Sequence, residues 1–196
     1  MSAMAPTDWV LRLLKRTEAL LDGHFLLSSG LHSDRYFQCA RLLQYPRRAA
    51  RVGRAIADLC RPFGAQLVVS PALGGVVIGH EVGRALGVRA IFTEREQGIM
   101  RLRRGFTIAP GERVLVVEDV VTTGGSTREV MDVARAQGGI PVGVGSIVNR
   151  SGKDNPLDPL PFSALLTIDV ANHPPEACPM CQAGSPVTKP GSRVGS

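Results

Sequence analysis

The sequence has few aromatic residues, few cysteines and no long hydrophobic run, and each shortage excludes a class of protein. Aromatic residues make up only 5% of the chain, which is weak support for a nucleic-acid-binding protein. Four cysteines, with Cys39 and Cys60 far apart, do not indicate a disulfide framework. No apolar run approaches the roughly 20 residues of a membrane span, and the N-terminus lacks the charge order of a signal peptide. We therefore expect a cytoplasmic protein that binds neither membranes nor nucleic acid.

Length and charge indicate a single globular domain with anionic ligands. The 196 residues are 44% hydrophobic, which is enough for one well-buried core. Lysine and arginine outnumber aspartate and glutamate by 23 to 17, and the net charge is +6. This modest excess favours ligands that carry phosphate groups.

Hydrophobic periodicity alternates along the chain between that of helices and that of strands. Apolar residues recur at helical spacing from Trp9 to Leu21, which predicts an amphipathic first helix that ends at Asp22 and Gly23. Further predicted helices cover 47–60, 76–86 and 126–137, and predicted strands cover 66–70, 89–93, 113–119 and 141–149. This order is typical of an α/β fold with a mostly parallel central sheet flanked by helices on both faces. In such sheets, ligands bind at the carboxyl ends of the strands.

Two predicted strand-to-helix loops carry glycines at this edge of the sheet. The loops cover 71–75, which includes Gly74 and Gly75, and 122–127. Main-chain N–H groups at a helix start are a natural seat for an anion. The second loop follows two carboxylates, Glu118 and Asp119, which would repel a phosphate unless they face vicinal hydroxyls or a divalent cation. Ribose 5-phosphate offers a diol at one end and a phosphate at the other.

The segment VLVVEDVVTTGGST, residues 114–127, resembles the phosphoribosyl-diphosphate-binding motif of the type I phosphoribosyltransferases. The resemblance implies that Glu118 and Asp119 hold the ribose hydroxyls and that the following loop encloses the 5′-phosphate, with Mg²⁺ bound through the substrate. The implied phosphoribosyl-diphosphate site consists of Glu118, Asp119, Val120, Val121, Thr122, Thr123, Gly124, Gly125, Ser126 and Thr127, with Ala72, Leu73, Gly74 and Gly75 at the pyrophosphate.

The segment GHFLLSSGLHSDRYFQCARLL, residues 23–43, resembles the N-terminal hood of the orotate phosphoribosyltransferases. The resemblance implies a small hood over about residues 1–45. It also implies that the orotate ring is contacted by Ser28, Tyr36, Phe37 and Thr122. Arg150 follows a predicted strand at the place where that family has an arginine facing orotate, and a guanidinium can grip a carboxylate with two hydrogen bonds.

The segment FTEREQGIMRLRRGF, residues 92–106, departs from the mobile loop of that family because it lacks the usual catalytic lysine and histidine. The loop must still place cations on a pyrophosphate leaving group. The candidates for this role are Arg95, Arg101, Arg103 and Arg104, which join Glu118 and Asp119 as expected catalytic residues. In the family this loop reaches the active site of the partner subunit, so the resemblance implies a homodimer. The alternative is a solvated charged hairpin.

The chain becomes rich in proline, glycine and serine after Asn172. We expect one domain over residues 1–172 and an irregular or partly ordered tail over residues 173–196. The tail contains CPMC, and Cys178 and Cys181 are either two free thiols or half of a zinc site to which His173 or another subunit contributes. Three further histidines lack metal-ligand spacing and are expected to be packing or surface residues, namely His24, His32 and His80.

The resemblance implies transfer of a phosphoribosyl group from phosphoribosyl diphosphate to orotate, which gives orotidine 5′-monophosphate and pyrophosphate. Two alternatives stay open. A purine-base phosphoribosyltransferase would keep both phosphate loops but replace the hood and the Arg150 contact. A regulator would sense phosphoribosyl diphosphate and bind nucleic acid through its basic surface.

Overall fold

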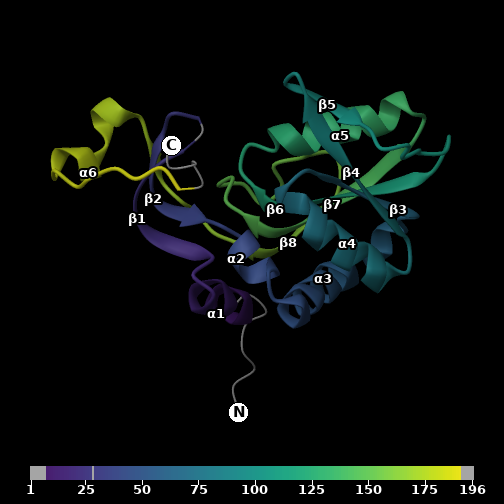
Figure 1. Ribbon diagram of the computed structural model, residues 1–196, viewed down its shortest axis with the longest axis horizontal. Coiled ribbons are helices and arrows are strands. Elements are labelled where there is room, and N and C mark those ends of the chain that lie inside the picture. The colour runs from purple at the N-terminus through teal and green to yellow at the C-terminus, as the bar shows by residue number, and fades with distance from the viewer. Residues whose placement is uncertain (1–7, 28, 191–196) are drawn as a thin grey trace, which may run out of the picture.

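The computed structural model describes residues 8–27 and 29–190 and consists of an α/β body with a smaller lobe beside it (Figure 1). The body contains a six-stranded sheet of order β5-β4-β3-β6-β7-β8, and the lobe contains a three-stranded sheet of order β1-β2-β9. The elements are α1 (Asp8–Arg16), β1 (Leu20–Leu26), β2 (His32–Phe37), α2 (Ala40–Leu43), α3 (Pro46–Cys60), η1 (Arg61–Phe63), β3 (Leu67–Pro71), α4 (Gly74–Leu86), β4 (Arg89–Glu96), β5 (Ile99–Leu102), β6 (Arg113–Val121), α5 (Gly125–Ala136), β7 (Ile140–Asn149), β8 (Phe162–Thr167), β9 (Asn172–His173), η2 (Pro175–Ala177) and α6 (Pro179–Gln182).

The central sheet is parallel except at one edge. Strands β4, β3, β6, β7 and β8 pair in parallel in that order, and only the β4–β5 pair is antiparallel. Residues Val114 to Val117 of β6 are all buried, as expected for a strand that is covered on both faces. The predicted mostly parallel α/β fold is therefore confirmed. Because β3 and β6 are parallel neighbours, their carboxyl ends lie side by side at the same end of the sheet.

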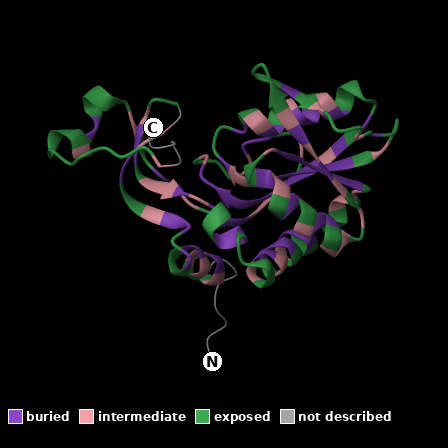
Figure 2. Ribbon diagram, viewed as in Figure 1, coloured by how far each residue is buried: buried purple, intermediate pink, exposed green. Residues whose placement is uncertain are grey.

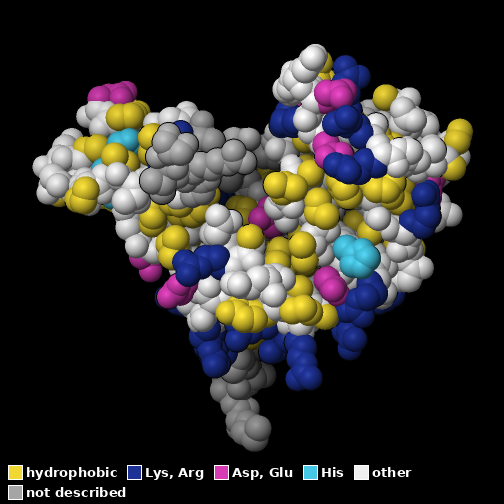
Figure 3. Space-filling view, viewed as in Figure 1, with side chains coloured by type: hydrophobic (Ala, Val, Ile, Leu, Met, Phe, Trp, Pro, Cys, Tyr) yellow, Lys and Arg dark blue, Asp and Glu magenta, His cyan; other side chains and the backbone are white. Residues whose placement is uncertain are grey.

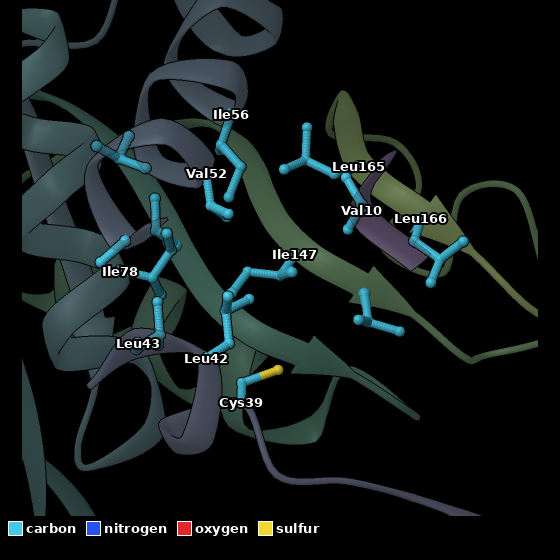
Figure 4. Packing of buried hydrophobic residues seen from close by; sticks show 14 of the residues in the cluster. Val10, Cys39, Leu42, Leu43, Val52, Ile56, Ile78, Ile147, Leu165 and Leu166 are labelled. Carbon is cyan, nitrogen blue, oxygen red and sulfur yellow. The ribbon is translucent and has the colours of Figure 1, made fainter. Parts of the chain in front are cut away.

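Helices cover the two faces of this sheet with separate hydrophobic clusters. On one face, α3 and α4 contribute Val52, Ile56 and Ile78, which pack around Ile147 of β7 (Figure 4). On the other face, α5 contributes a second cluster that includes Val130. The strands between the two layers form the most deeply buried part of the body (Figure 2). In the part of the chain that the structure describes, no helix has the length and apolar character needed to cross a bilayer.

The first helix is shorter than its periodicity predicts. It ends at Arg16 instead of continuing to Leu21, because Glu18 adopts a left-handed conformation with φ of 51°. The Ala19 amide donates to the Leu14 carbonyl at 2.8 Å, and the Glu18 amide donates to the Lys15 carbonyl at 3.0 Å. These two bonds form a Schellman motif, which ends a helix. The sequence signal is weak because glutamate occupies the position that glycine usually takes.

The lobe, called the hood below, consists of β1, β2 and β9. Strands β1 and β2 form an antiparallel pair, and Ser33 of β2 pairs with Asn172 of β9. Asn172 and His173 are thus part of the hood sheet, and the chain continues into η2 and α6 within the tail that the sequence analysis expected to be irregular or partly ordered. The sequence did not predict these elements because their pairing partners are distant in the chain.

The segment between 93 and 102 forms a tight hairpin. Its turn residues, Gln97 and Gly98, both have positive φ, of 52° and 84°. This combination is typical of a type I′ turn, which matches the twist of the two strands that it joins. The polar, basic composition of the segment hid strand β5 from the sequence analysis.

Candidate active site

Two carboxylates lie at the carboxyl end of β6, between two glycine loops. Glu118 and Asp119 are half-buried, and Asp119 Oδ1 accepts a hydrogen bond from the Val120 amide at 2.9 Å. Val121 is buried, so its contact with a ligand would come from its main chain. The fold therefore places both acids at the sheet edge where the sequence analysis expected them.

The electrostatic environment of these acids favours a positively charged or hydrogen-donating ligand. Burial raises the pKa of Glu118 to about 9, and the neighbouring charge of Asp119 contributes to the rise. Burial also raises the pKa of Asp119 above its usual value. Two adjacent carboxyl groups in a poorly hydrated place resist full ionisation. A cation or a pair of hydroxyl donors would stabilise their charged form.

The loop after β6 turns sharply into α5. Gly124 has φ of +77°, and a Cβ atom at this position would lie 2.7 Å from Leu157 Cδ2. Thr122, Thr123 and Gly125 are exposed, so the loop offers its surface to a ligand at the positive end of the helix. The loop thus has the geometry of an anion seat.

The sequence analysis missed Arg128, whose side chain braces this loop. Its Nη1 donates to the Thr123 carbonyl at 2.7 Å, and its Nη2 donates to the Pro156 carbonyl at 2.6 Å. The guanidinium therefore joins the loop to the segment before β8. The second partner lies 28 positions along the chain, and a lone arginine on a helix gives no sequence signal for such a contact.

The loop after β3 lies directly against Asp119. The Ala72–Leu73 peptide bond is cis, and the Ala72 amide donates to the Thr93 carbonyl at 2.8 Å. A Cβ atom at Gly74 would lie 2.7 Å from Asp119 Oδ1, so only glycine fits beside the carboxylate. The two glycine loops predicted from sequence thus meet on either side of one acid.

A cleft of about 520 Å³ separates the hood from the end of β6. Tyr36 and Phe37 line its hood side, and Asp119, Thr122 and Arg150 line its body side. Predicted Ser28 lies outside the described residues. Val120 and Thr123 of the predicted phosphoribosyl-diphosphate site also line the cleft. The sequence analysis did not predict the other lining residues, which are Leu27, Ser29, Leu31, Gln38 and Asn172. A neighbouring hollow of about 410 Å³ is bordered by Leu73 and Gly74.

Arg150 is fixed at the cleft by residues of the hood sheet. Its side chain is buried, and its Nη2 donates to Ser33 Oγ at 3.2 Å and to Asn172 Oδ1 at 2.8 Å. Its buried Nε has no hydrogen-bond partner among residues 8–27 and 29–190. Burial lowers the pKa of the guanidinium, and the charge of Asp34 offsets part of that effect. A buried cation with an unused donor is a suitable contact for an anionic ligand.

The four candidate arginines of the hairpin do not line the cleft within this chain. Each pairs with a nearby acid, and Figure 3 shows the alternating charges on the projecting hairpin. The pairs are Arg95 with Glu129 at 2.8 Å, Arg101 with Glu96 at 3.5 Å, Arg103 with Glu96 at 3.3 Å and Arg104 with Glu94 at 2.7 Å. All of these arginine side chains are about half exposed, so the pairs can exchange for other anions at small cost.

The cysteines of the CPMC motif lie beside two histidines of the hood. Ligand atoms of Cys178, Cys181, His24 and His32 are all within 4.8 Å of one another. His24 and His32, which the sequence analysis expected to be packing or surface residues, are both buried, and the pairing of β1 with β2 brings them together although their sequence spacing is not that of metal ligands. His173 is not a member of this group.

Comparison with known proteins identifies the family. No family model matches the chain. The orotate phosphoribosyltransferase of Heliobacterium modesticaldum is 54% identical over 189 residues, which are 95% of this chain and 98% of that protein. The orotate phosphoribosyltransferase of Thermotoga maritima is 50% identical over 92% of this chain and 96% of its own length.

Solved structures agree in fold. The orotate phosphoribosyltransferase of Mycobacterium tuberculosis has a TM-score of 0.68 and 24% identity over 84% of this chain and 97% of that one. The UMP synthase of Leishmania donovani has a TM-score of 0.72 and 23% identity over 82% of this chain and 36% of that one. These similarities confirm the predicted fold and enzyme class, and the sequence identities show that the chain belongs to the orotate phosphoribosyltransferase family.

Proposed function

We propose that the cleft between the hood and the end of β6 is where this chain joins orotate to the phosphoribosyl group of phosphoribosyl diphosphate. The observation that carries the proposal is the position of Asp119, which lies between two glycine loops and also lines the cleft. A ligand at this place meets acids at its centre, an anion seat in each loop and a buried guanidinium opposite. Phosphoribosyl diphosphate with orotate matches this order of groups.

The sugar phosphate would lie along the motif of residues 118–127. The carboxylates of Glu118 and Asp119 accept hydrogen bonds from the ribose 2′ and 3′ hydroxyls, beside Val120 and Val121. The amides of the loop enclose the 5′-phosphate at the start of α5, from residues Thr122, Thr123, Gly124, Gly125, Ser126 and Thr127. The pyrophosphate lies against the loop formed by Ala72, Leu73, Gly74 and Gly75.

Orotate would lie between the hood and Arg150. The guanidinium binds the carboxylate or a carbonyl edge of the base, and Tyr36 and Phe37 contact the ring. Thr122 lies on the same wall of the cleft. A purine base carries no carboxylate, so the buried positive charge of Arg150 favours orotate over purines.

The acids at the end of β6 suit Mg²⁺ as a cofactor. Mg²⁺ prefers oxygen ligands and is commonly held by one or two carboxylates together with substrate phosphates. The ion would be held through the oxygens of phosphoribosyl diphosphate, and its charge near Glu118 and Asp119 would stabilise the ionised form of these acids, whose pKa values burial raises. When bound, the ion would neutralise charge on the pyrophosphate.

The reaction is a displacement at the ribose anomeric carbon. The N1 atom of the orotate anion forms a bond to C1′ with its electron pair, and the C1′–O bond to pyrophosphate breaks with its electrons on the leaving oxygen. Asp119, with Glu118, stabilises positive charge that develops on the ribosyl ring. The chain otherwise acts by holding both substrates in line and excluding water.

Cations for the leaving group would come from the hairpin of a second subunit. Arg95, Arg101 and Arg103 do not line the cleft of their own chain and are about half exposed. A homodimer with shared active sites would bring them to the partner's pyrophosphate.

Reducing conditions suit this enzyme, because its four cysteines are free, and we place it in the cytoplasm.

An orotate-dependent absorbance assay with phosphoribosyl diphosphate and Mg²⁺ tests the proposal. We expect turnover with orotate and little with hypoxanthine, adenine or uracil. Turnover with a purine alone would support the first alternative, and ligand binding without turnover but with salt-sensitive binding to RNA or DNA would support a regulator.

Substitution of Asp119→Asn in the same assay tests the role of the acid. The amide keeps the size of the side chain but removes its charge, so we expect kcat to fall by about 10²- to 10³-fold with an unchanged circular dichroism spectrum. A near-normal rate would remove Asp119 from the mechanism.

A further inference from the structure

A second group of chemically active side chains lies in the hood, apart from the cleft residues. His24 comes from β1, His32 from β2, and Cys178 and Cys181 from the start of α6. The segment with the two cysteines lies beside the hood strands (Figure 1), 154 positions from His24. Two imidazoles and two thiols are a common ligand set of tetrahedral zinc.

The distances between these atoms approach those of a tetrahedral site. His24 Nε2 lies 3.5 Å from Cys178 Sγ and 3.7 Å from Cys181 Sγ, and His32 Nδ1 lies 3.3 Å from Cys181 Sγ. Zinc bond lengths require a nitrogen–sulfur separation of about 3.6 Å. The two nitrogens are 2.8 Å apart. They would separate by about 0.5 Å around an ion.

The contact of the other ring nitrogen of His24 selects the tautomer that a metal ligand needs. Its Nδ1 lies 2.9 Å from the carbonyl oxygen of Ser185, which can only accept a hydrogen bond. In the neutral imidazole Nδ1 therefore carries the proton, and the lone pair of Nε2 is left on the side of His32 Nδ1 and the two sulfurs. Histidine ligands of metals typically make this type of contact with a carbonyl or carboxylate.

The segment from 171 to 190 has no hydrophobic core that would explain its ordered position. Within these residues, Cys178 alone is buried. His24 and His32 are also buried, at 4% and 7% exposure, although they lie under a polar segment. Small segments that lack a core are commonly stabilised by a metal or a disulfide.

We propose that His24, His32, Cys178 and Cys181 bind one zinc ion that fastens the C-terminal segment to the hood. The C-x₂-C spacing on a helix start is typical of structural zinc sites. Four protein ligands leave no open position, so the ion has a structural role and takes no part in ribosyl transfer. The Thr188 amide, which donates to the His24 carbonyl at 2.8 Å, continues the same attachment along β1.

Metal content of the full chain tests this site independently of activity. The chain is purified under reducing conditions without chelator, and zinc is measured by elemental mass spectrometry. We expect one zinc per chain in the wild type and less than about a tenth of that in Cys181→Ala and His24→Ala. His173→Ala and His80→Ala are matched controls outside the ligand group and should keep the zinc.

Cobalt absorption provides a second readout that needs no variant. Addition of Co²⁺ to the metal-free wild type should produce the intense visible bands of a tetrahedral thiolate site, and zinc should displace them. Zinc at wild-type levels in both ligand variants would overturn the proposal. A metal-free wild type that gives no cobalt bands, or a Cys178–Cys181 disulfide in freshly purified protein, would overturn it too.

Discussion

The half-buried acids at the end of β6 give the ligand-free protein a distinctive response to pH. The pKa of Glu118 is about 9 in the folded chain, against an ordinary value of 4.5. Between these values the folded chain holds a proton that the unfolded chain has released. The free energy of unfolding should therefore decrease as pH rises through this window, by up to about 1.4 kcal/mol per pH unit from this group.

Urea denaturation of ligand-free protein between pH 5 and 9 measures this effect. Glu118→Gln mimics the protonated carboxyl, so it should flatten the decrease in stability and be the more stable chain at pH 9. Identical slopes for the wild type and the variant would show that Glu118 ionises normally.

Arg150 should determine affinity for orotate by the shape of its side chain as well as its charge. Arg150→Lys keeps the charge but loses the planar group that reaches Ser33 and Asn172. We expect the KM for orotate to rise by about 10- to 100-fold, and the KM for phosphoribosyl diphosphate to change little. Arg84→Lys, at an exposed pair with Glu81, is the control in steady-state kinetics. An unchanged KM for orotate would place the base elsewhere.

The β4–β5 hairpin should act on the partner's site. A chain with Arg101→Ala and Arg103→Ala and a chain with Asp119→Asn should each be nearly inactive. After the two are mixed and allowed to exchange subunits, half of the dimers contain one intact site, so activity should recover to about a quarter of the wild-type value. No recovery in a mixture that is shown to form mixed dimers would mean that the hairpin serves its own subunit.

Local sequence signals predicted the elements that depend on local interactions. The strands and helices between 66 and 149 followed hydrophobic periodicity, and the glycine loops lie at the sheet edge as expected. The first helix was predicted too long because Glu18 takes a conformation that its residue type rarely adopts. Strand β5 was missed because it has only four residues and lies within a polar, basic segment.

The remaining features depend on contacts between distant parts of the chain, and sequence could not predict them. Asn172 reaches Arg150 because β9 pairs with β2, and the two histidines reach Cys178 and Cys181 because the hood hairpin folds beneath α6. The residue types in one short stretch of sequence do not indicate which distant stretch it will contact. The cleft therefore has a wall that includes Asn172, the last residue of the predicted domain, which the sequence analysis did not place at the site.

The proposed zinc site links the C-terminal segment to substrate binding across the whole molecule. Asn172 supports Arg150 and belongs to the strand that leads to the CPMC motif. Metal removal by a chelator should lower Tm by at least about 5 °C and raise the KM for orotate more than that for phosphoribosyl diphosphate. Thermal denaturation and kinetics before and after zinc is restored check this. Equal changes in both KM values would show that the zinc site does not act through the part of the cleft that binds orotate.

A crystal structure with phosphoribosyl diphosphate and Mg²⁺ tests the central claim most directly. We predict that the ribose hydroxyls lie within about 3.2 Å of carboxylate oxygens of Glu118 and Asp119, with the 5′-phosphate against the amides that begin α5. A sugar whose hydroxyls face other residues, or a phosphate outside that loop, would contradict the account.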